Sequence, residues 1–283
     1  MAAITQKIQA RISEGLKKFQ PIIESAKIRD VSESDTVVLL TGVLSEILGY
    51  DKYVDITTEL AIRSSYCDLA LKIDGKVSLL IEAKAVGIDL KEPHVKQAVD
   101  YAANKGIEWV ILTNSVNWRI YKVIFSKPIQ NILVCEIDFL KLKHKSTEDM
   151  ERIFLLSKEA VSKSSLDHYF TQKQATSKFI IGNLLGEDSV LNVLRKELKQ
   201  LFPDIKVTTD EIKNVLYQDV IKREMLEGEE ADEARKKIVR LNKKQEKTKT
   251  VKNIPTSTLE KIQEIVLKEQ EPKLGAANSV TAN

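Results

Sequence analysis

Two apolar runs that meet at Asp74-Gly75 constrain the fold of this chain more than any other feature of its sequence. The first run covers residues 66–73 and the second covers residues 77–84. An Asp-Gly pair between two apolar runs is a strong signal for a β-hairpin, in which the two runs pair as antiparallel strands. We therefore expect a sheet that contains this hairpin.

Two carboxylates and one amine lie on the predicted hairpin. Asp68 interrupts the first run, and Glu82 and Lys84 close the second run, which is otherwise nearly all apolar. Antiparallel pairing brings Asp68 towards Glu82 and Lys84, which alternation places on the same side of their strand. A surface ion pair is the ordinary interpretation of Glu-X-Lys, but a solvated strand would more often alternate polar and apolar residues. The apolar context therefore favours a functional site.

These groups suit metal-dependent hydrolysis of a phosphodiester. Hard divalent cations held by carboxylates bring water to the phosphorus and stabilise the charge that grows on its oxygens. Asp68 and Glu82 are suitable ligands for Mg²⁺, with Mn²⁺ as an alternative, and the carbonyl of Ala83 is a candidate third ligand. Lys84 can position or deprotonate the attacking water and offset charge at the phosphorus.

Composition sets broad limits on the chain. Its 283 residues allow one substantial domain and a smaller second unit. A net charge of +3 permits a nucleic-acid partner without requiring one. The sequence contains neither an apolar stretch long enough to span a bilayer nor an apolar N-terminal signal core, so we expect a cytoplasmic protein without a membrane partner.

Several chemically distinctive residues lie inside apolar runs and are expected to be core residues. Cys67 and Cys135 are interpreted as small buried hydrophobic residues, in preference to a disulfide or a ligand pair. Trp109, Trp118 and Tyr121 lie in strand-like runs, where aromatic side chains more often pack than stack on bases.

The order of periodic segments predicts an α/β domain over residues 1–141, a helical domain over residues 145–230, and a basic, largely flexible tail over residues 231–283. In the tail, residues 235–252 are strongly basic and suit either phosphate contacts or a solvated arm. The first domain is predicted as a mixed sheet flanked by helices. Its expected helices cover residues 3–19, 32–49 and 93–104, and its expected strands cover residues 54–62, 66–73, 77–85, 109–113, 118–125 and 132–139.

The candidate residues occur in a recognisable order along the chain: Asp68, then Glu82-Ala83-Lys84, then Gln97 and Tyr101 on the next predicted helix. The segment from about Arg29 to Val123 resembles the N-terminal nuclease domain of type I restriction enzyme R subunits, within the PD-(D/E)XK nuclease superfamily. One departure is Cys67, which stands where proline would precede Asp68. The resemblance implies a restriction-endonuclease-like α/β fold.

The resemblance also implies roles for individual residues. Asp68 and Glu82 would bind the metal, and Lys84 would be catalytic. Gln97 and Tyr101 lie one helical turn apart and would act beside the catalytic centre, on DNA or on the lysine, although such a pair can also pack at a sheet edge.

The superfamily usually adds a glutamate from a helix that precedes the sheet. Glu33 and Glu46 compete for this role. Glu33 continues the apolar face of its predicted helix and is therefore preferred, although a glutamate in a first turn also complements the helix dipole.

The sequence thus predicts a metal-dependent endonuclease that hydrolyses DNA in a restriction or defence system. The alternative is a non-catalytic nucleic-acid-binding or assembly module that works with another subunit. Type I R subunits carry a translocating ATPase after the nuclease domain, whereas this sequence has no glycine-rich phosphate loop and continues as a short helical segment. We therefore expect neither a complete R subunit nor ATP-driven cleavage by this chain alone. The sequence leaves the oligomeric state open.

Overall fold

The structure is a computed structural model that describes residues 4–62 and 65–252. The chain forms two compact units, Met1–Gln174 (unit 1) and Ala175–Asn283 (unit 2). Across the described ranges, none of the helices combines the length and apolar character needed to cross a membrane.

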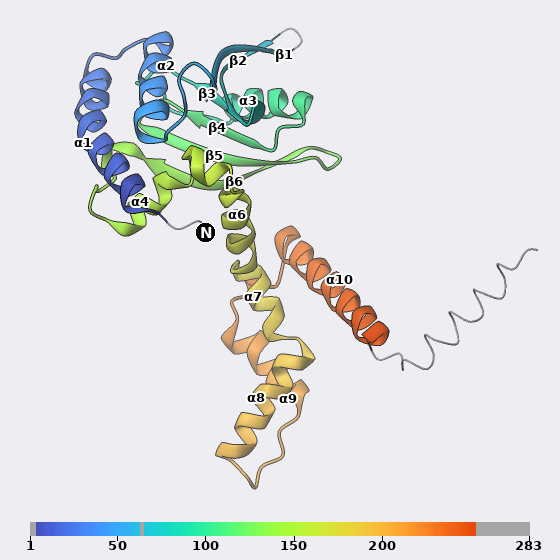
Figure 1. The fold of residues 1–283 in the computed structure, drawn as a ribbon. Helices are drawn as coiled ribbons and strands as arrows, with labels where there is room; N and C mark the ends of the chain where they lie inside the picture. Colours follow the sequence, from blue (N-terminus) through green and yellow to red (C-terminus); the bar gives the residue numbers. More distant parts are fainter. Residues whose placement is uncertain (1–3, 63–64, 253–283) are drawn as a thin grey trace, which may run out of the picture. The chain divides into compact units, whose positions relative to one another are not determined.

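Unit 1 is built on one six-stranded mixed sheet (Figure 1). The strands follow the chain order across the sheet, and all neighbours are antiparallel except β3 and β4, whose connection contains helix α3 (Glu92–Lys105). The predicted α/β class, a mixed sheet flanked by helices, is confirmed. The strands are β1 (Ile56–Ile62), β2 (Ser65–Ile73), β3 (Lys76–Ala83), β4 (Trp109–Thr113), β5 (Asn117–Ile124) and β6 (Gln130–Asp138).

The predicted hairpin is formed by β2 and β3. Ile73 pairs with Lys76, and the two residues between them have positive φ angles, 49° for Asp74 and 77° for Gly75. Positive φ at both central residues is the requirement of a type I′ turn, which asparagine, aspartate and glycine satisfy at low cost. The Asp-Gly pair therefore forms the hairpin turn. The register then shifts by one residue between Leu71 and Lys72, and the turn and this irregularity together place Asp68 next to Glu82.

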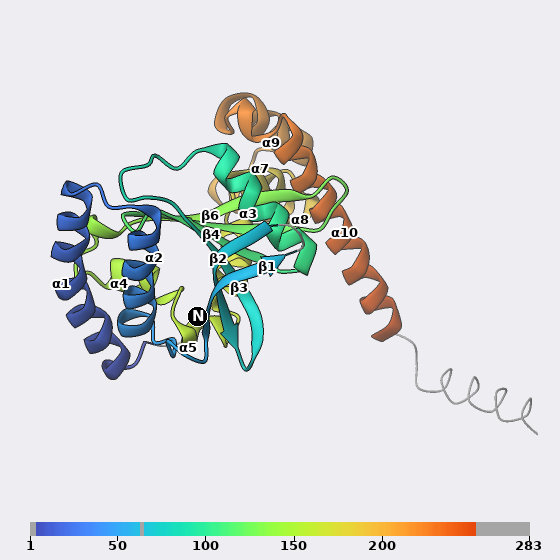
Figure 2. The same ribbon diagram turned by 90° about the horizontal axis from the view of Figure 1, so that it is seen from above.

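Helices cover both faces of this sheet (Figures 1 and 2). On one face, α1 (Gln6–Ile28) and α2 (Glu33–Gly42) pack on a large core that contains Leu69 and Ile81 of the hairpin. On the other face, α3 packs on a second core that contains Ala70 and Leu80. The alternating strand residues therefore divide between two cores, as the pleat requires.

Helix α1 runs well beyond the predicted end at residue 19. It includes Pro21 and continues to Ile28, because Ile23 and Ala26 extend the buried stripe of Leu16 and Phe19 by steps of three and four residues. Helix α2 ends in a π-helical turn, η1 (Val43–Ile47).

Unit 1 also includes helices that the sequence assigned to the second domain: α4 (Thr147–Phe154), α5 (Lys158–Val161) and α6 (Ser165–Ala175). Ile153, Phe154 and Leu156 are buried in the same core as α1. The boundary between the units thus lies after Gln174 and not between residues 141 and 145. The amphipathic pattern of these helices reveals that they have an apolar face, but it does not reveal which core that face joins.

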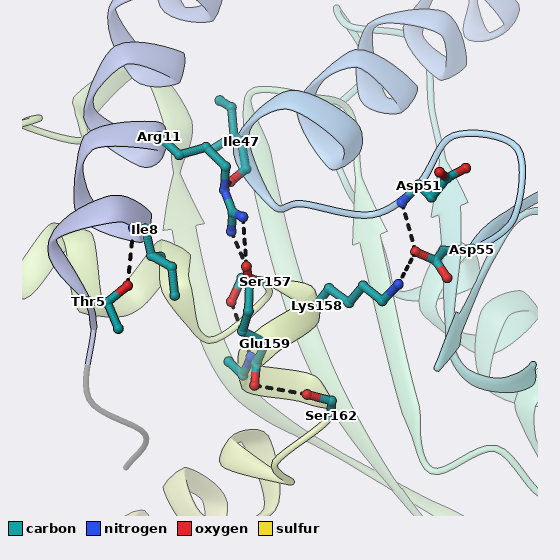
Figure 3. A network of polar contacts seen from close by, with 11 residues as sticks. Thr5, Ile8, Arg11, Ile47, Asp51, Asp55, Ser157, Lys158, Glu159 and Ser162 are labelled. Carbon is teal, nitrogen blue, oxygen red and sulfur yellow. Dashed lines mark hydrogen bonds and ion pairs between the residues drawn. The ribbon is translucent and has the colours of Figure 1, made fainter. Parts of the chain in front are cut away.

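Polar contacts tie α5 to the rest of unit 1 (Figure 3). The guanidinium of Arg11 donates to both carboxylate oxygens of Glu159, at 2.7 and 2.8 Å, and its Nε donates to the carbonyl of Ile47 at 3.0 Å. Lys158 donates to the buried carboxylate of Asp55 at 2.5 Å. Burial raises the pKa of Asp55, but the hydrogen bond and charge of Lys158 outweigh it, so the net pKa is lowered.

Unit 2 consists of short helices and one longer helix. Thr208 and Glu211 form a reciprocal capping box at the start of its third helix. Residues 229–252, most of which the sequence assigned to a flexible tail, form the last helix; the rest of that predicted tail lies outside the described residues. The elements are α7 (Lys178–Leu185), α8 (Asp188–Leu201), α9 (Thr209–Val215), the π-helical turn η3 (Leu216–Val220), the 3-10 turn η4 (Arg223–Met225) and α10 (Glu229–Lys252).

Candidate functional site

The candidate residues of unit 1 gather where β2 and β3 run side by side. Leu69 pairs with Ile81, so Asp68 and Glu82 directly flank this pair on adjacent strands. Both acidic residues are in phase with Ala70 and Leu80, which belong to the core under α3. The hairpin therefore brings the two carboxylates close together, as predicted.

Asp68 is half-buried and bonded to the backbone of the neighbouring strand. Its Oδ2 accepts a hydrogen bond from the backbone N–H of Ala83 at 2.7 Å. This bond holds the Asp68 carboxylate against the backbone of Ala83, the residue between Glu82 and Lys84.

Glu82 is a buried carboxylate whose two oxygens differ. Only 2% of the residue is exposed; its Oε1 accepts from Lys84 Nζ at 2.8 Å, whereas Oε2 has no hydrogen-bond partner in the described structure. Burial raises the pKa of Glu82, as do the negative charges of Asp68 and Glu33. Lys84 lowers it, and the net result is a pKa of about 7. A buried oxygen without a partner is costly, and a bound cation or a proton would satisfy it.

Lys84 lies between two carboxylates. Its Nζ contacts Glu82 Oε1 and also Glu33 Oε2, the latter at 3.4 Å. Burial lowers the pKa of Lys84, but the hydrogen bond and charge of Glu82 and the charges of Glu33 and Asp68 outweigh it, so the net pKa is raised. Lys84 is therefore a cation at neutral pH in this arrangement.

Glu33 reaches Lys84 from the first turn of α2. Its helix begins after Ser32, whose hydroxyl caps the helix by accepting from the backbone N–H of Asp35 at 3.2 Å. Glu46, the competing candidate, instead forms an ion pair with Lys18 of α1. The structure thus brings Glu33, and not Glu46, to the strand-end residues.

Gln97 and Tyr101 are brought to each other. On α3, the side-chain amide of Gln97 donates to the hydroxyl of Tyr101 at 2.9 Å; Tyr101 is buried and Gln97 is exposed. In the described part of the chain, no hydrogen bond joins either residue to Glu82 or Lys84.

Sequence reasoning missed the residues that support the segment after Lys84. The backbone N–H of Lys84 donates to the carbonyl of Thr113 at 2.8 Å, which extends the pairing of β3 with β4. Asn114 is buried; its amide donates to the carbonyls of Val86 and Ile88, at 3.3 and 2.9 Å, and its oxygen accepts from the turn that begins β5. The asparagine-serine pair after a buried strand is a turn signal that could have indicated this support.

The donor set at the strand ends fits a hard divalent cation. Two carboxylates and a backbone carbonyl are oxygen ligands of the kind that Mg²⁺ prefers, and Mg²⁺ keeps several waters in its shell. Among the described residues, no three histidine, cysteine, aspartate or glutamate side chains form a metal-binding group. The fit therefore rests on the Asp68–Glu82 pair and on the unpartnered Oε2 of Glu82.

The nearby cysteine is not equipped to be a metal ligand. Cys67 is 1% exposed and free, and burial, followed by the charges of Glu82 and Asp68, raises the pKa of its thiol to about 12. Cys135 is also free and buried, so both cysteines are the core residues that the sequence predicts. The same holds for Trp109, Trp118 and Tyr121.

Part of unit 1 matches a known protein family. Residues 40–137 match the family model described as Type I restriction enzyme R protein N terminus. The match confirms the resemblance predicted from the sequence; it contains the candidates of the hairpin and of α3, whereas Glu33 lies before it. This restriction-enzyme segment supports a nuclease-like role in a restriction system.

The other comparisons add little to the family match. One matching structure comes from a study titled "Characterization and crystal structure of the type IIG restriction endonuclease BpuSI", with 17% sequence identity and a TM-score of 0.27. The match covers 77% of this chain, which spans only 28% of that endonuclease. No curated protein matches the sequence. At that TM-score the structural likeness carries no argument about the site.

Proposed function

We propose that this chain is a metal-dependent endonuclease that hydrolyses DNA phosphodiester bonds. The observation that carries the proposal is the buried Glu82, which has one oxygen on Lys84 and the other unpartnered, beside Asp68. A buried, unpaired carboxylate oxygen is costly for a purely structural residue, but it is useful in a site that receives a cation.

Asp68 and Glu82 would hold Mg²⁺ or Mn²⁺, with the carbonyl of Ala83 as a third ligand. The bound metal would activate a water and offset charge at the phosphorus. The contact between Asp68 and the Ala83 N–H holds its carboxylate against β3, so that both carboxylates are positioned before the metal arrives.

Lys84 would act as a cation in this proposal. Its raised pKa disfavours a neutral amine, so stabilising negative charge on the phosphate and orienting water suit it better than deprotonating water. Glu33 accepts from the same Nζ and would hold the lysine in place. Since neither Gln97 nor Tyr101 is hydrogen-bonded to Lys84 in the described structure, a contact with DNA fits this pair better than orienting the lysine.

A second candidate is a non-catalytic nucleic-acid-binding or assembly module of a restriction or defence system. One observation favours it: across the described residues, no group of three acidic, histidine or cysteine side chains forms a metal site. Such a module would act together with other subunits of that system.

A cleavage assay with a matched pair of variants tests the proposal. The purified chain is incubated with supercoiled and linear DNA and Mg²⁺ or Mn²⁺, beside Lys84→Ala and Lys76→Ala. Lys76 is an exposed lysine at the opposite end of β3, so it controls for loss of a lysine from the same strand.

We expect cleavage by the wild type and by Lys76→Ala, and a loss of roughly 10²–10⁴-fold in Lys84→Ala. Metal-dependent cleavage that survives Lys84→Ala would remove the assigned site. Binding of DNA without cleavage, with every metal tested, would favour the second candidate.

A further inference from the structure

A basic depression lies on the surface of unit 2. It has a volume of about 650 Å³ and is bounded by the C-terminal half of α8 and by the loop that follows it. Its charged lining consists of Arg195, Lys196, Lys199, Lys206 and one carboxylate, Asp204. We call these five residues and the space between them the α8 groove.

The α8 groove is more basic than the segment that contains it. Residues 175–243 of unit 2 carry thirteen basic and thirteen acidic side chains, so this segment as a whole is balanced. In the groove, four cations face one carboxylate.

The four cations of the α8 groove are also unpaired. Elsewhere in unit 2, Arg223 pairs with Glu227 and Arg235 pairs with Asp232. By contrast, Arg195, Lys196, Lys199 and Lys206 form no ion pair with any described residue. The groove therefore keeps its charges available to a ligand.

The close spacing of these cations destabilises the protein without a ligand, because like charges repel. Arg195 and Lys199 are four residues apart on α8, and Lys196 and Lys199 are three apart, so like charges lie side by side on one helix face. The helix dipole accounts for a lysine in the last turn, such as Lys199, but its effect fades beyond that turn. An anionic ligand would turn this repulsion into attraction.

We propose that the α8 groove binds the phosphodiester backbone of duplex DNA. The choice of DNA as the polyanion rests on the proposed function, whereas the choice of a polyanion rests on the four unpaired cations alone. No aromatic side chain is among the residues that line the groove, so it offers no platform for unstacked bases. The contact is thus made to phosphates and does not depend on base sequence.

The test compares two charge-matched variants of the full-length chain. In the groove variant, Arg195→Gln, Lys199→Gln and Lys206→Gln are combined. In the control variant, Lys213→Gln, Lys222→Gln and Arg223→Gln are combined, all outside the basic stretch of residues 235–252. Both variants remove three positive charges from unit 2, and none of the six side chains is buried. Circular dichroism confirms that each variant folds like the wild type.

Binding of a short fluorescent DNA duplex is measured by anisotropy in EDTA over a series of salt concentrations, so no cleavage is involved. We expect the groove variant to bind roughly 10-fold or more weakly at low salt. Its salt slope should fall by about three, because three cations are removed and each phosphate that the protein no longer neutralises lowers the slope by about one unit. The control variant should bind within about threefold of the wild type. The conservative variant Arg195→Lys should also bind like the wild type.

Three outcomes would overturn the proposal: wild-type binding by the groove variant, an equal loss in the control variant, or tighter binding of RNA than of DNA through the same residues. The measurement is independent of catalysis. If Lys84→Ala and the wild type bind equally and neither cleaves, the proposed function fails while the α8 groove stands.

Discussion

Unit 1 and unit 2 are both rich in helices, but within the described residues only unit 1 packs its helices on a sheet. Its two cores bury long stripes of apolar residues, and even its ion pairs at α1 and α5 are partly shielded. In unit 2 few large apolar side chains are buried, among them Leu191, Ile212 and Ile238, and its ion pairs are exposed. Unit 1 is therefore equipped to hold a buried carboxylate in a fixed, costly position, whereas unit 2 presents charge on its surface.

The two units should differ most in the unfolding free energy that is lost when a buried side chain is truncated. Phe139 is fully buried in unit 1 and stacks on Trp118 with ring centroids 6.5 Å apart, so Phe139→Ala should cost about 3–5 kcal/mol of unfolding free energy. Leu191→Ala in unit 2 should cost about 2–3 kcal/mol, at the low end for leucine, because its neighbours are more exposed.

Tryptophan fluorescence during urea unfolding separates the two effects. The sequence has two tryptophans, Trp109 and Trp118, and both lie in unit 1. Phe139→Ala should lower the fluorescence midpoint, whereas Leu191→Ala should lower only a transition seen by far-ultraviolet circular dichroism. An equal shift of the fluorescence midpoint in both variants would show that the units do not differ in this way.

A second prediction concerns the cost of burying Glu82. Its pKa is about 7 in the folded protein, against an ordinary value of 4.5, so the folded state binds more protons than the unfolded state between these values. Without a metal, the unfolding free energy should therefore fall as pH rises from 4.5 to 7, by about 2–3 kcal/mol.

Urea unfolding in chelator at several pH values measures this slope, and Glu82→Gln should flatten it. Asp55 and Glu159 have lowered pKa values, so their contributions change below pH 4.5 and do not obscure the window. A wild-type slope that Glu82→Gln leaves unchanged would mean that another group is responsible.

The contribution of ion pairs to the unfolding free energy should also differ between the units, but by a smaller amount. Arg11 makes a two-pronged contact with Glu159 and a third bond to Ile47, whereas the guanidinium of Arg223 pairs with Glu227 on an open helical turn. Arg11→Ala should cost about 1–2 kcal/mol, and Arg223→Ala less than about 0.5 kcal/mol. Thermal unfolding of both variants tests this, and similar losses would contradict the contrast.

The smallest predicted effect distinguishes Glu33 from Glu46, the two glutamates that compete for the role beside Lys84. Glu33→Gln weakens the hold on Lys84 and should reduce cleavage roughly 3–10-fold, since Glu33 is half exposed and Lys84 keeps its bond to Glu82. Glu46→Gln, which breaks only the pair with Lys18, should leave cleavage unchanged. A larger loss in Glu46→Gln would reverse the assignment.

Local signals predicted the parts of the fold that local chemistry decides. Asp74-Gly75 indicated the hairpin because the type I′ turn demands positive φ, and the hairpin brings Asp68 towards Glu82. The one-residue register shift between Leu71 and Lys72, which completes this alignment, had no such local signal. Gly106, with φ of 67°, likewise marks the end of α3.

Features decided by tertiary packing were not predictable in this way. Nothing local shows that α4 and α5 join the core of α1, or that Ser157 starts a new helix between residues 147 and 163. At the site, alternation predicted that Glu82 and Lys84 share a side, but not that Asn114 supports the segment after them. These contacts join residues whose partners are chosen by the folded surroundings.

The central claim is that Asp68 and Glu82 form a site for a divalent cation. Calorimetric titration of Mn²⁺ at pH 8, where Glu82 is mostly ionised, tests it most directly, with Glu82→Gln and Glu46→Gln as a matched pair. We predict one binding site in the wild type and in Glu46→Gln, and a loss of at least about tenfold in affinity in Glu82→Gln. Equal Mn²⁺ affinity in all three proteins would contradict the claim.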